Sequence, residues 1–186
     1  MLKPAMRSIG RLWLAGLLLL CATACSLPPA KGLPALSQMP ALPLTQQLEV
    51  RWREHSFSFL LIQQGLPGQQ AGLQVVATTL TGQQLFALVY DGKQVKVLQR
   101  VEEMKRLPFD YLLRDVLWAS WPLDSVQAGI QPYGYTLQEQ ATGQNQISRQ
   151  ISAAGKLVLD VQRDSSGQLH VENKQAGYVL DITPVE

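Results

Sequence analysis

The sequence of 186 residues is poor in the residue types that most often carry catalysis or bind metals. It contains two histidines, His55 and His170, and two cysteines, Cys21 and Cys25. It has no Gly-x-Ser-x-Gly motif and no glycine-rich phosphate loop between a strand pattern and a helix. Two scattered histidines without thiolates cannot complete a tetrahedral metal shell. We therefore expect no catalytic residue, no metal site and no cofactor.

An acid–base pair is the enzymatic alternative that stays open. Asp110 and Asp115 lie near Arg114, and paired carboxylates can transfer protons. The same residues suit the first half of a helix and a surface ion pair, which contributes little to stability. His55 and His170 lie in predicted strands beside polar residues, which favours solvated side chains. An esterase or acyltransferase therefore ranks third among the possible functions.

An excess of charge of one sign is absent once residues 1–24 are set apart. That segment holds Lys3, Arg7 and Arg11 and no acidic residue, which leaves 13 basic residues against 14 acidic ones. The remainder has no basic patch of the kind that binds nucleic acid, and no second apolar run approaches the ~20 residues of a spanning helix. We expect no nucleic-acid partner.

The N-terminal segment has the pattern of a bacterial lipoprotein signal. The three basic residues precede an apolar run, residues 12–20, which is too short for a permanent spanning helix. Ala22-Thr23-Ala24 then places small residues directly before Cys25, whose thiol can accept diacylglycerol before cleavage. Cys21 is the weaker candidate because bulky Leu20 precedes it. We predict a signal peptide over residues 1–24 and lipid attachment at Cys25.

The residue after the predicted lipid site gives the expected location. Ser26, rather than an aspartate, follows Cys25, which in enteric-type sorting indicates the outer membrane. Two or more acyl chains anchor a protein stably. We therefore predict a lipid-anchored protein on the periplasmic face of the outer membrane. The acylated Cys25 would be the single cysteine left in the mature chain, so we expect a fold stabilised by its hydrophobic core without a disulfide.

Residues 25–44 form a predicted proline-rich tether, and residues 45–186 a single β-rich domain. Five prolines, at positions 28, 29, 34, 40 and 43, favour extended backbone. At ~3.1 Å per residue such a tether reaches roughly 50–60 Å. The alternative is that its apolar side chains, Leu33, Leu36, Met39 and Leu42, dock onto the domain.

Apolar and polar residues alternate through most of the chain, which predicts antiparallel strands with one buried face. The predicted strands are residues 45–53, 56–64, 71–80, 83–90, 93–99, 134–140, 145–152, 156–163, 168–174 and 177–183. Asp91-Gly92 between two of them is a strong hairpin pattern. The sequence therefore predicts a ten-stranded meander interrupted once.

The interruption has helical periodicity. Pro108 suits a helix start, and apolar residues recur at spacings of three and four as far as Trp121. Pro122 opens a second short helix through Ala128, with Gly129 as its stop. Because one side of this pair is almost wholly apolar, we expect it to cover the apolar face of the sheet. The predicted class is mainly β (α+β), with a strongly curved antiparallel sheet, a half-barrel, whose concave face is covered by the central helical insert.

Three stretches carry a resemblance to a known family. The chain resembles uncharacterised outer-membrane lipoproteins often encoded among aryl-polyene and fatty-acid-like biosynthetic clusters. The resemblance rests on the lipobox, on LRDVLWASWPLDSVQAGI, and on ENKQAGYVLDI; it includes Arg114-Asp115, Trp121-Pro122-Leu123, and Asn173 with Gly177-Tyr178. That family is similar in architecture to the LolA and LolB lipoprotein carriers, which implies an apolar cavity for acyl chains between a half-barrel and a helical lid. The family has no established catalytic residues to transfer.

The leading functional prediction is binding or transfer of an acyl or polyene-like ligand during envelope assembly. The candidate cavity residues are apolar residues of the strands and the helical insert: Phe57, Phe59, Leu61, Val76, Leu85, Leu88, Tyr90, Leu113, Leu117 and Trp118. The same side chains would also serve as a solid core packed at native density. The second prediction, of a different class, is a non-catalytic adaptor that docks a partner protein of the envelope.

Two residues are candidate membrane contacts. Leu66 lies in the turn Gln64-Gly65-Leu66-Pro67-Gly68, and LolB-like proteins resemble this chain in carrying an apolar loop residue that touches the bilayer. Trp121 is the second, because an indole favours the boundary between apolar and aqueous surroundings.

Overall fold

The computed structural model of this chain describes residues 30–66 and 72–185. The predicted signal peptide, Cys25 and the start of the predicted tether lie outside the described residues, so lipid attachment stays a prediction. In the ranges that are described, no helix has the length and apolar character needed to cross a membrane.

Ten strands, two α-helices and three short 3-10 helices make up the described chain. The strands are β1 (Leu44–Trp52), β2 (His55–Gly65), β3 (Leu73–Thr78), β4 (Gln84–Tyr90), β5 (Val95–Arg100), β6 (Tyr135–Gly143), β7 (Gln146–Ala153), β8 (Lys156–Arg163), β9 (Leu169–Asn173) and β10 (Tyr178–Pro184). The helices are α2 (Phe109–Ser120), α3 (Leu123–Ile130), η2 (Leu36–Gln38), η3 (Glu102–Met104) and η4 (Gln131–Tyr133). The predicted elements agree with these bounds to within a few residues at each end.

All ten strands belong to one antiparallel sheet with the order β5-β4-β3-β2-β1-β10-β9-β8-β7-β6. Each half is a meander of neighbouring hairpins, and the halves join where β1 pairs with β10, Leu48 opposite Ile182. In the described residues β5 and β6 are the two edges, so the sheet is not closed. The prediction of a mainly β fold with ten antiparallel strands is confirmed, and the predicted Asp91-Gly92 hairpin joins β4 to β5, with φ +89° at Gly92.

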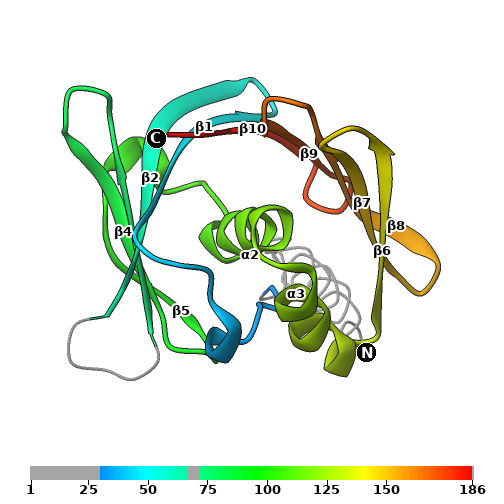
Figure 1. The fold of residues 1–186 in the computed structure, drawn as a ribbon. Coiled ribbons are helices and arrows are strands. Elements are labelled where there is room, and N and C mark those ends of the chain that lie inside the picture. The colour runs from blue at the N-terminus through cyan, green and yellow to red at the C-terminus, as the bar shows by residue number, and fades with distance from the viewer. Residues whose placement is uncertain (1–29, 67–71, 186) are drawn as a thin grey trace, which may run out of the picture.

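Helices α2 and α3 lie on the same side of the sheet, which bends around α2 (Figure 1). Helix α2 ends at Ser120, where the amide of Trp121 still donates to the carbonyl of Leu117 but Pro122 prevents continuation. Ten of its twelve residues are buried. An α-helix this buried on all sides is a core helix, and the prediction that the helical insert covers the apolar face is confirmed.

The interior between helix and sheet is filled by side chains from both. Phe59 packs edge-on against Phe86 at 5.4 Å between ring centroids, and Phe86 lies 4.8 Å from Phe109 of α2. Val116 and Leu117 from α2 join the same buried cluster. Aromatic pairs at these separations add about 0.5–1.5 kcal/mol beyond the burial of their area.

Residues 30–43, which we call the strap, are docked onto the domain, so a free tether extending to residue 44 is wrong. The carboxylate Oδ2 of Asp110 accepts from the amide of Ala30 at 2.7 Å, and Leu36 is buried in the core. Leu33, Met39 and Leu42 pack against the same core. The alternative of docked apolar side chains is the correct one, because burial of these side chains offsets the loss of chain entropy.

Side-chain donors of the domain fix the strap along its length. Trp118 Nε1 donates to the carbonyl of Gly32 at 2.6 Å, Tyr90 Oη to that of Pro34 at 3.1 Å, and Ser125 Oγ to that of Gln38 at 2.5 Å. Apart from the bond from the Gln38 amide to the Ala35 carbonyl in η2, such proline-rich backbone makes few internal hydrogen bonds, so the carbonyls of Gly32, Pro34 and Gln38 are free to accept. The strap thereby crosses α2 and α3 and leads into β1.

Candidate functional site

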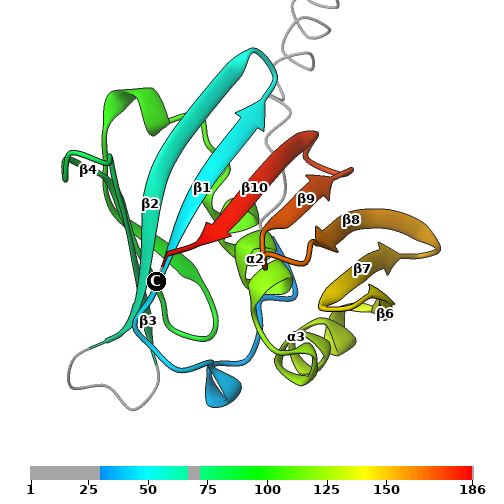
Figure 2. The same cartoon turned by 45° about the horizontal axis from the view of Figure 1, so that its top comes forward.

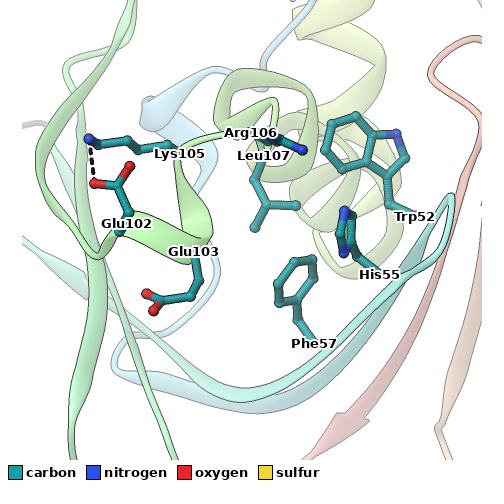
Figure 3. A pocket seen from close by; sticks show the side chains of 8 residues that line it. All are labelled: Trp52, His55, Phe57, Glu102, Glu103, Lys105, Arg106 and Leu107. Atoms are coloured by element: carbon teal, nitrogen blue, oxygen red, sulfur yellow. Dashed lines mark ion pairs between the residues drawn. The ribbon is translucent and has the colours of Figure 1, made fainter.

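A pocket of about 420 Å³, which we call the end pocket, opens beside the turn between β1 and β2. It lies between that turn and residues 101–108, the connector from β5 to α2. Figure 3 shows the side chains that line it: Trp52, His55, Phe57, Glu102, Glu103, Lys105, Arg106 and Leu107. Trp52 and Leu107 are buried and Phe57 is half-buried, whereas the four charged side chains of the connector are exposed.

A second hollow of about 430 Å³ adjoins the end pocket. The two share Phe57 and Glu103, and the second is also lined by Leu85, Val101 and Met104. The ring of Phe57 therefore stands between two open spaces on the rim of the core. Together they give a surface groove with an apolar floor under the connector.

The charges around the end pocket are partly paired. Lys105 Nζ lies 2.5 Å from Glu102 Oε2, and both side chains are largely exposed. The guanidinium of Arg53 lies over the Trp52 ring at 4.9 Å from its centroid, within the range of a cation–π contact. An apolar floor beneath groups of both signs suits a molecule with an apolar chain and a polar or charged head.

A polar cluster holds the middle of α2 inside the protein. The Asp115 carboxylate is fully buried and accepts from Arg114 Nε at 2.8 Å, from the Asn173 amide and from the Tyr178 hydroxyl. The expectation of a surface ion pair at Arg114 and Asp115 is therefore wrong. Asn173 and Tyr178 reach Asp115 because β9 and β10 pass beside α2. All of these residues belong to the stretches that carry the family resemblance.

The guanidinium of Arg114 is held between aromatic rings. It lies 4.5 Å from the Tyr111 centroid and 4.2 Å from that of Trp118, and its Nη2 has no hydrogen-bond partner among the described residues. Burial raises the pKa of Asp115 above its usual value, an effect opposed by the Arg114 charge and by the bond from Tyr178. Burial and then the Asp115 charge raise the pKa of Tyr178 well above its usual value. The enclosure of Asp115 favours a structural role for it.

A second arginine holds the end of α2. Arg149 of β7 donates from Nη1 to the carbonyls of Trp118 at 2.5 Å and Trp121 at 3.0 Å, and its Nε lies 2.6 Å from Glu139. The carbonyls of a last helical turn have no partner within the helix and carry partial negative charge. A buried guanidinium at this place satisfies them.

The predicted cavity residues do not share one open space. Phe57 and Leu85 line the two hollows, whereas a larger group lies in the packed core at 0–2% exposure: Phe59, Leu61, Leu88, Tyr90, Leu113, Leu117 and Trp118. Val76 is half-buried on the other face of β3, where Leu73, Val75 and Ala77 are the inward residues. For the core group and for Val76 the placement as cavity lining is corrected.

Trp52, Leu107 and the charged connector are not among the residues predicted for the site. Trp52 follows Leu48 and Val50 at strand spacing, so its inward direction was readable from the alternation. Nothing in the pattern marked the connector, because its position over β2 depends on the fold.

The two candidate membrane contacts have different surroundings. Trp121 is 1% exposed and its Nε1 donates to Gln63 Oε1 at 3.2 Å, so its assignment as a membrane contact is corrected. Leu66 is half-buried, at the end of β2 away from the end pocket, and its side chain lies over Gly72. In the described residues, no three of the potential histidine, cysteine or carboxylate ligands are grouped for a metal.

Comparison with known proteins shows the family. Residues 43–186 match a family described as protein of unknown function (DUF3261), and the chain belongs to it. A search of curated proteins gives no match. Among solved structures, a LolA superfamily protein from Nitrosomonas europaea is similar at 8% identity, covering 77% of this chain and 83% of that one, with a TM-score of 0.34. A score this low carries no conclusion about the present chain.

Proposed function

We propose that this chain is a lipoprotein of the outer membrane, anchored through Cys25, that binds an acyl or polyene-like ligand in the end pocket during envelope lipid or lipoprotein assembly. In this proposal the sheet is a half-barrel, and the protein has no catalytic step. The observation that supports it is the end pocket of about 420 Å³, which lies within the range of small-molecule sites. The lipobox at residues 22–25 supports the location.

The position of the end pocket indicates how a bound ligand would lie. Because α2 fills the centre of the sheet, an apolar chain would lie along Phe57 and Leu107 at one end rather than across the whole interior. The polar head would lie among the exposed Glu103, Lys105 and Arg106. A single chain or a short polyene fits this space better than several acyl chains at once.

The test uses the mature chain with Cys25→Ala and the fluorescent polyene cis-parinaric acid. The wild-type pocket is expected to bind the probe, and Phe57→Asp to weaken binding by about tenfold or more, because a charge replaces the ring between the two hollows. Leu98→Asp, at an exposed position of β5, is the matched control. Native mass spectrometry of the same protein should detect a co-purified lipid. Absence of both the lipid and probe binding would refute the proposal.

A second candidate, the adaptor, is favoured by the edge of the sheet. Strand β5 is an unpaired edge in the described sheet, and Val97 and Leu98 on it are 36% and 52% exposed. Exposed edges accept a strand from another protein. A stoichiometric partner that is lost with Leu98→Lys and kept with Phe57→Asp would favour the adaptor over the ligand carrier.

A further inference from the structure

Strand β2 extends beyond the strand that pairs with it on one side. On the β1 side the pairing of β2 continues to His55, whereas on the β3 side it ends at Leu60. The chain leaves β3 in a turn, residues 79–83, whose ends are joined by a backbone hydrogen bond. Figure 2 shows the β1–β2 hairpin reaching past this turn. In the described sheet residues 55–59, which we call the β2 edge, therefore have a paired strand on one side only.

The register shows which backbone groups of the β2 edge are open. The Leu66 amide donates to the Gly72 carbonyl in continuation of the β2–β3 register, so the even-numbered residues of β2 point their N–H and C=O groups toward β3. By the same alternation Ser56 and Ser58 point theirs to the side where β3 has ended. Among the described residues no backbone group pairs with them there. Both serines are exposed, so water satisfies these groups in the isolated chain.

The second hollow lies along the β2 edge. Its volume is about 430 Å³, and Ser56 and Ser58 line one side of it. Leu85 of β4 and Met104 of the connector line it with apolar side chains. The hollow therefore combines the open backbone of a strand with apolar side chains, which are the two features that bind an extended peptide segment.

A strand bound at this edge has a defined side-chain pattern. Its residues opposite Ser56 and Ser58 point to the outer face of the sheet, and the residue between them points to the inner face beside Phe57. The inner position meets Leu85 and Met104, whereas the outer positions meet solvent. The matching segment therefore has an apolar residue between two polar ones.

The rim of the hollow indicates the charge of the partner. Glu103 is exposed and forms no ion pair with any described residue, whereas the neighbouring Glu102 is paired with Lys105. An unpaired carboxylate at the rim favours a lysine or arginine on the partner. Leu80, in the turn whose ends line the hollow, is 68% exposed and offers a further apolar contact.

We propose that the β2 edge is a docking site for an extended segment of a partner protein, in which an apolar residue lies between polar ones and a basic residue is close by. The segment continues the line of β3 and pairs antiparallel with residues 55–59. Main-chain hydrogen bonds supply the affinity of such strand addition, and alternate side chains supply its specificity. The site is distinct from the ligand site in the end pocket and from the β5 edge, and it depends on neither the ligand nor the lipid anchor.

The test uses the isotope-labelled mature chain with Cys25→Ala and the capped peptide Lys-Thr-Val-Thr-Lys. The threonines are placed opposite the two serines of the β2 edge, and the valine between them. Amide exchange measured by NMR is expected to be fast at Ser56 and Ser58 in the free protein, and to slow by about tenfold or more at Ser58 with excess peptide. Phe59, whose amide faces β1, should be protected in both states. Unchanged exchange at Ser58 with millimolar peptide would overturn the site.

Methylated peptides test the backbone pairing directly. Methyl groups on both threonine nitrogens remove the donors that face β2, whereas a methyl group on the valine nitrogen leaves these donors in place. The first peptide is expected to bind about tenfold more weakly or not at all, and the second to keep most of the affinity. Equal weakening by both would show that the peptide does not add as a strand.

A pair of proline variants locates the site. Ser58→Pro removes an N–H that points to the open side, so the pairing with β1 is kept. Val97→Pro makes the same change on β5, because the bond from the Asp91 amide to Gln94 sets a register in which the Val97 N–H points away from β4. Ser58→Pro should lose peptide binding and Val97→Pro should keep it. The reverse result would assign the peptide to β5 and overturn the proposal. If Ser58→Pro unfolds at lower urea, the methylated peptides decide.

A pair of charge variants tests the rim. Glu103→Gln should weaken peptide binding by about two- to fivefold and reduce its dependence on salt. Glu102→Gln, which removes a charge already paired within the protein, should have the smaller effect. Equal effects would exclude Glu103 as the contact of the basic residue.

Other occupants of the β2 edge give different results. Exchange at Ser58 that slows with protein concentration alone would assign the edge to a second copy of the chain. Exchange that slows with cis-parinaric acid but not with the peptide would assign the hollow to the lipid. Either result overturns the peptide site. Failure of cis-parinaric acid to bind, with peptide binding intact, would refute the ligand proposal and leave the docking site in place.

Discussion

The two halves of the sheet hold the helices by different kinds of contact. Strands β6–β10 supply directional polar groups, with Asn173 and Tyr178 on Asp115 and Arg149 on the end of α2. Strands β1–β5 contact the start of α2 mainly through rings such as Phe86. Both hollows beside Phe57 lie on the β1–β5 side. Apart from the bond from the Trp121 indole to Gln63 of β2, the side-chain hydrogen bonds between α2 and the sheet in the described residues involve β6–β10, and the two hollows next to the connector lie on the more apolar side.

The largest loss of free energy of unfolding is expected when the Asp115 carboxylate is removed. Asp115→Ala leaves the Arg114 charge buried without its partner, and removing one member of a buried pair costs about 3–5 kcal/mol. Urea unfolding of the Cys25→Ala protein measures the change. The double variant Arg114→Met/Asp115→Leu should lose less than the single one. An equal or greater loss in the double variant would show that the pair does not act through its charge.

A smaller loss is expected at the end of α2. Arg149→Met keeps much of the side-chain volume but leaves the Trp118 and Trp121 carbonyls without their donor. A hydrogen bond with a charged group contributes about 1.5–3 kcal/mol, so we expect a loss of about 2 kcal/mol in urea. Arg51→Met is the control, because the pair of Arg51 with Asp181 is largely exposed on the arginine side and contributes about 0–1 kcal/mol. Similar losses in both variants would contradict the proposed role of Arg149.

On the apolar side a conservative change should be tolerated better. Phe86→Leu keeps an apolar side chain between Phe59 and Phe109 but removes the ring contacts with both, which contribute about 0.5–1.5 kcal/mol each, so we expect a loss of about 1–2 kcal/mol. Hydrogen exchange of α2 amides should rise at the Phe109 end and stay low near Asp115. A loss larger than that of Arg149→Met would reverse the contrast between the halves.

The smallest change in stability is expected for Tyr90 in alkaline solution. Burial raises the pKa of Tyr90 from 10.0 to about 12. The folded protein therefore holds this proton more tightly than the unfolded chain, so the contribution is complete below pH 10 and is lost as the pH rises toward 12. Tyr90→Phe should reduce the fall in urea stability between pH 9 and pH 11, and Tyr133→Phe, which removes only a smaller contribution to the raised pKa of Tyr90, should reduce it less. An identical fall in Tyr90→Phe would exclude this origin.

Strand and helix positions were predictable because they depend on local pattern. In β2 the alternation Phe57, Phe59, Leu61 gave the inward face correctly. In β3 the adjacent Val75 and Val76 carry no alternation, so the pattern does not decide which one points inward. Val75 is the inward residue, and the expectation for Val76 is wrong. The apolar residues of the strap were equally ambiguous, since both a free tether and a docked segment suit a proline-rich sequence.

The candidate site was less predictable because its partners are remote in the chain. Trp121 was expected at the membrane, yet its indole donates to Gln63, which is brought near by the packing of α2 on β2. Arg114 and Asp115 were expected at the surface, since charged side chains are rarely buried without partners. Their partners Asn173 and Tyr178 lie about 60 residues further along the chain.

The sequence by itself determined the ten strands, the helical insert and the apolar face, because period and turn residues act over a few neighbours. Tertiary structure decided which apolar residues border open space, that the strap is docked, and that a charged pair is enclosed. Those outcomes depend on the pairing of β1 with β10 and on how completely the side chains of α2 fill the space on the inner face of the sheet. Such contacts join residues far apart in the chain, and no local pattern encodes the volume left between them.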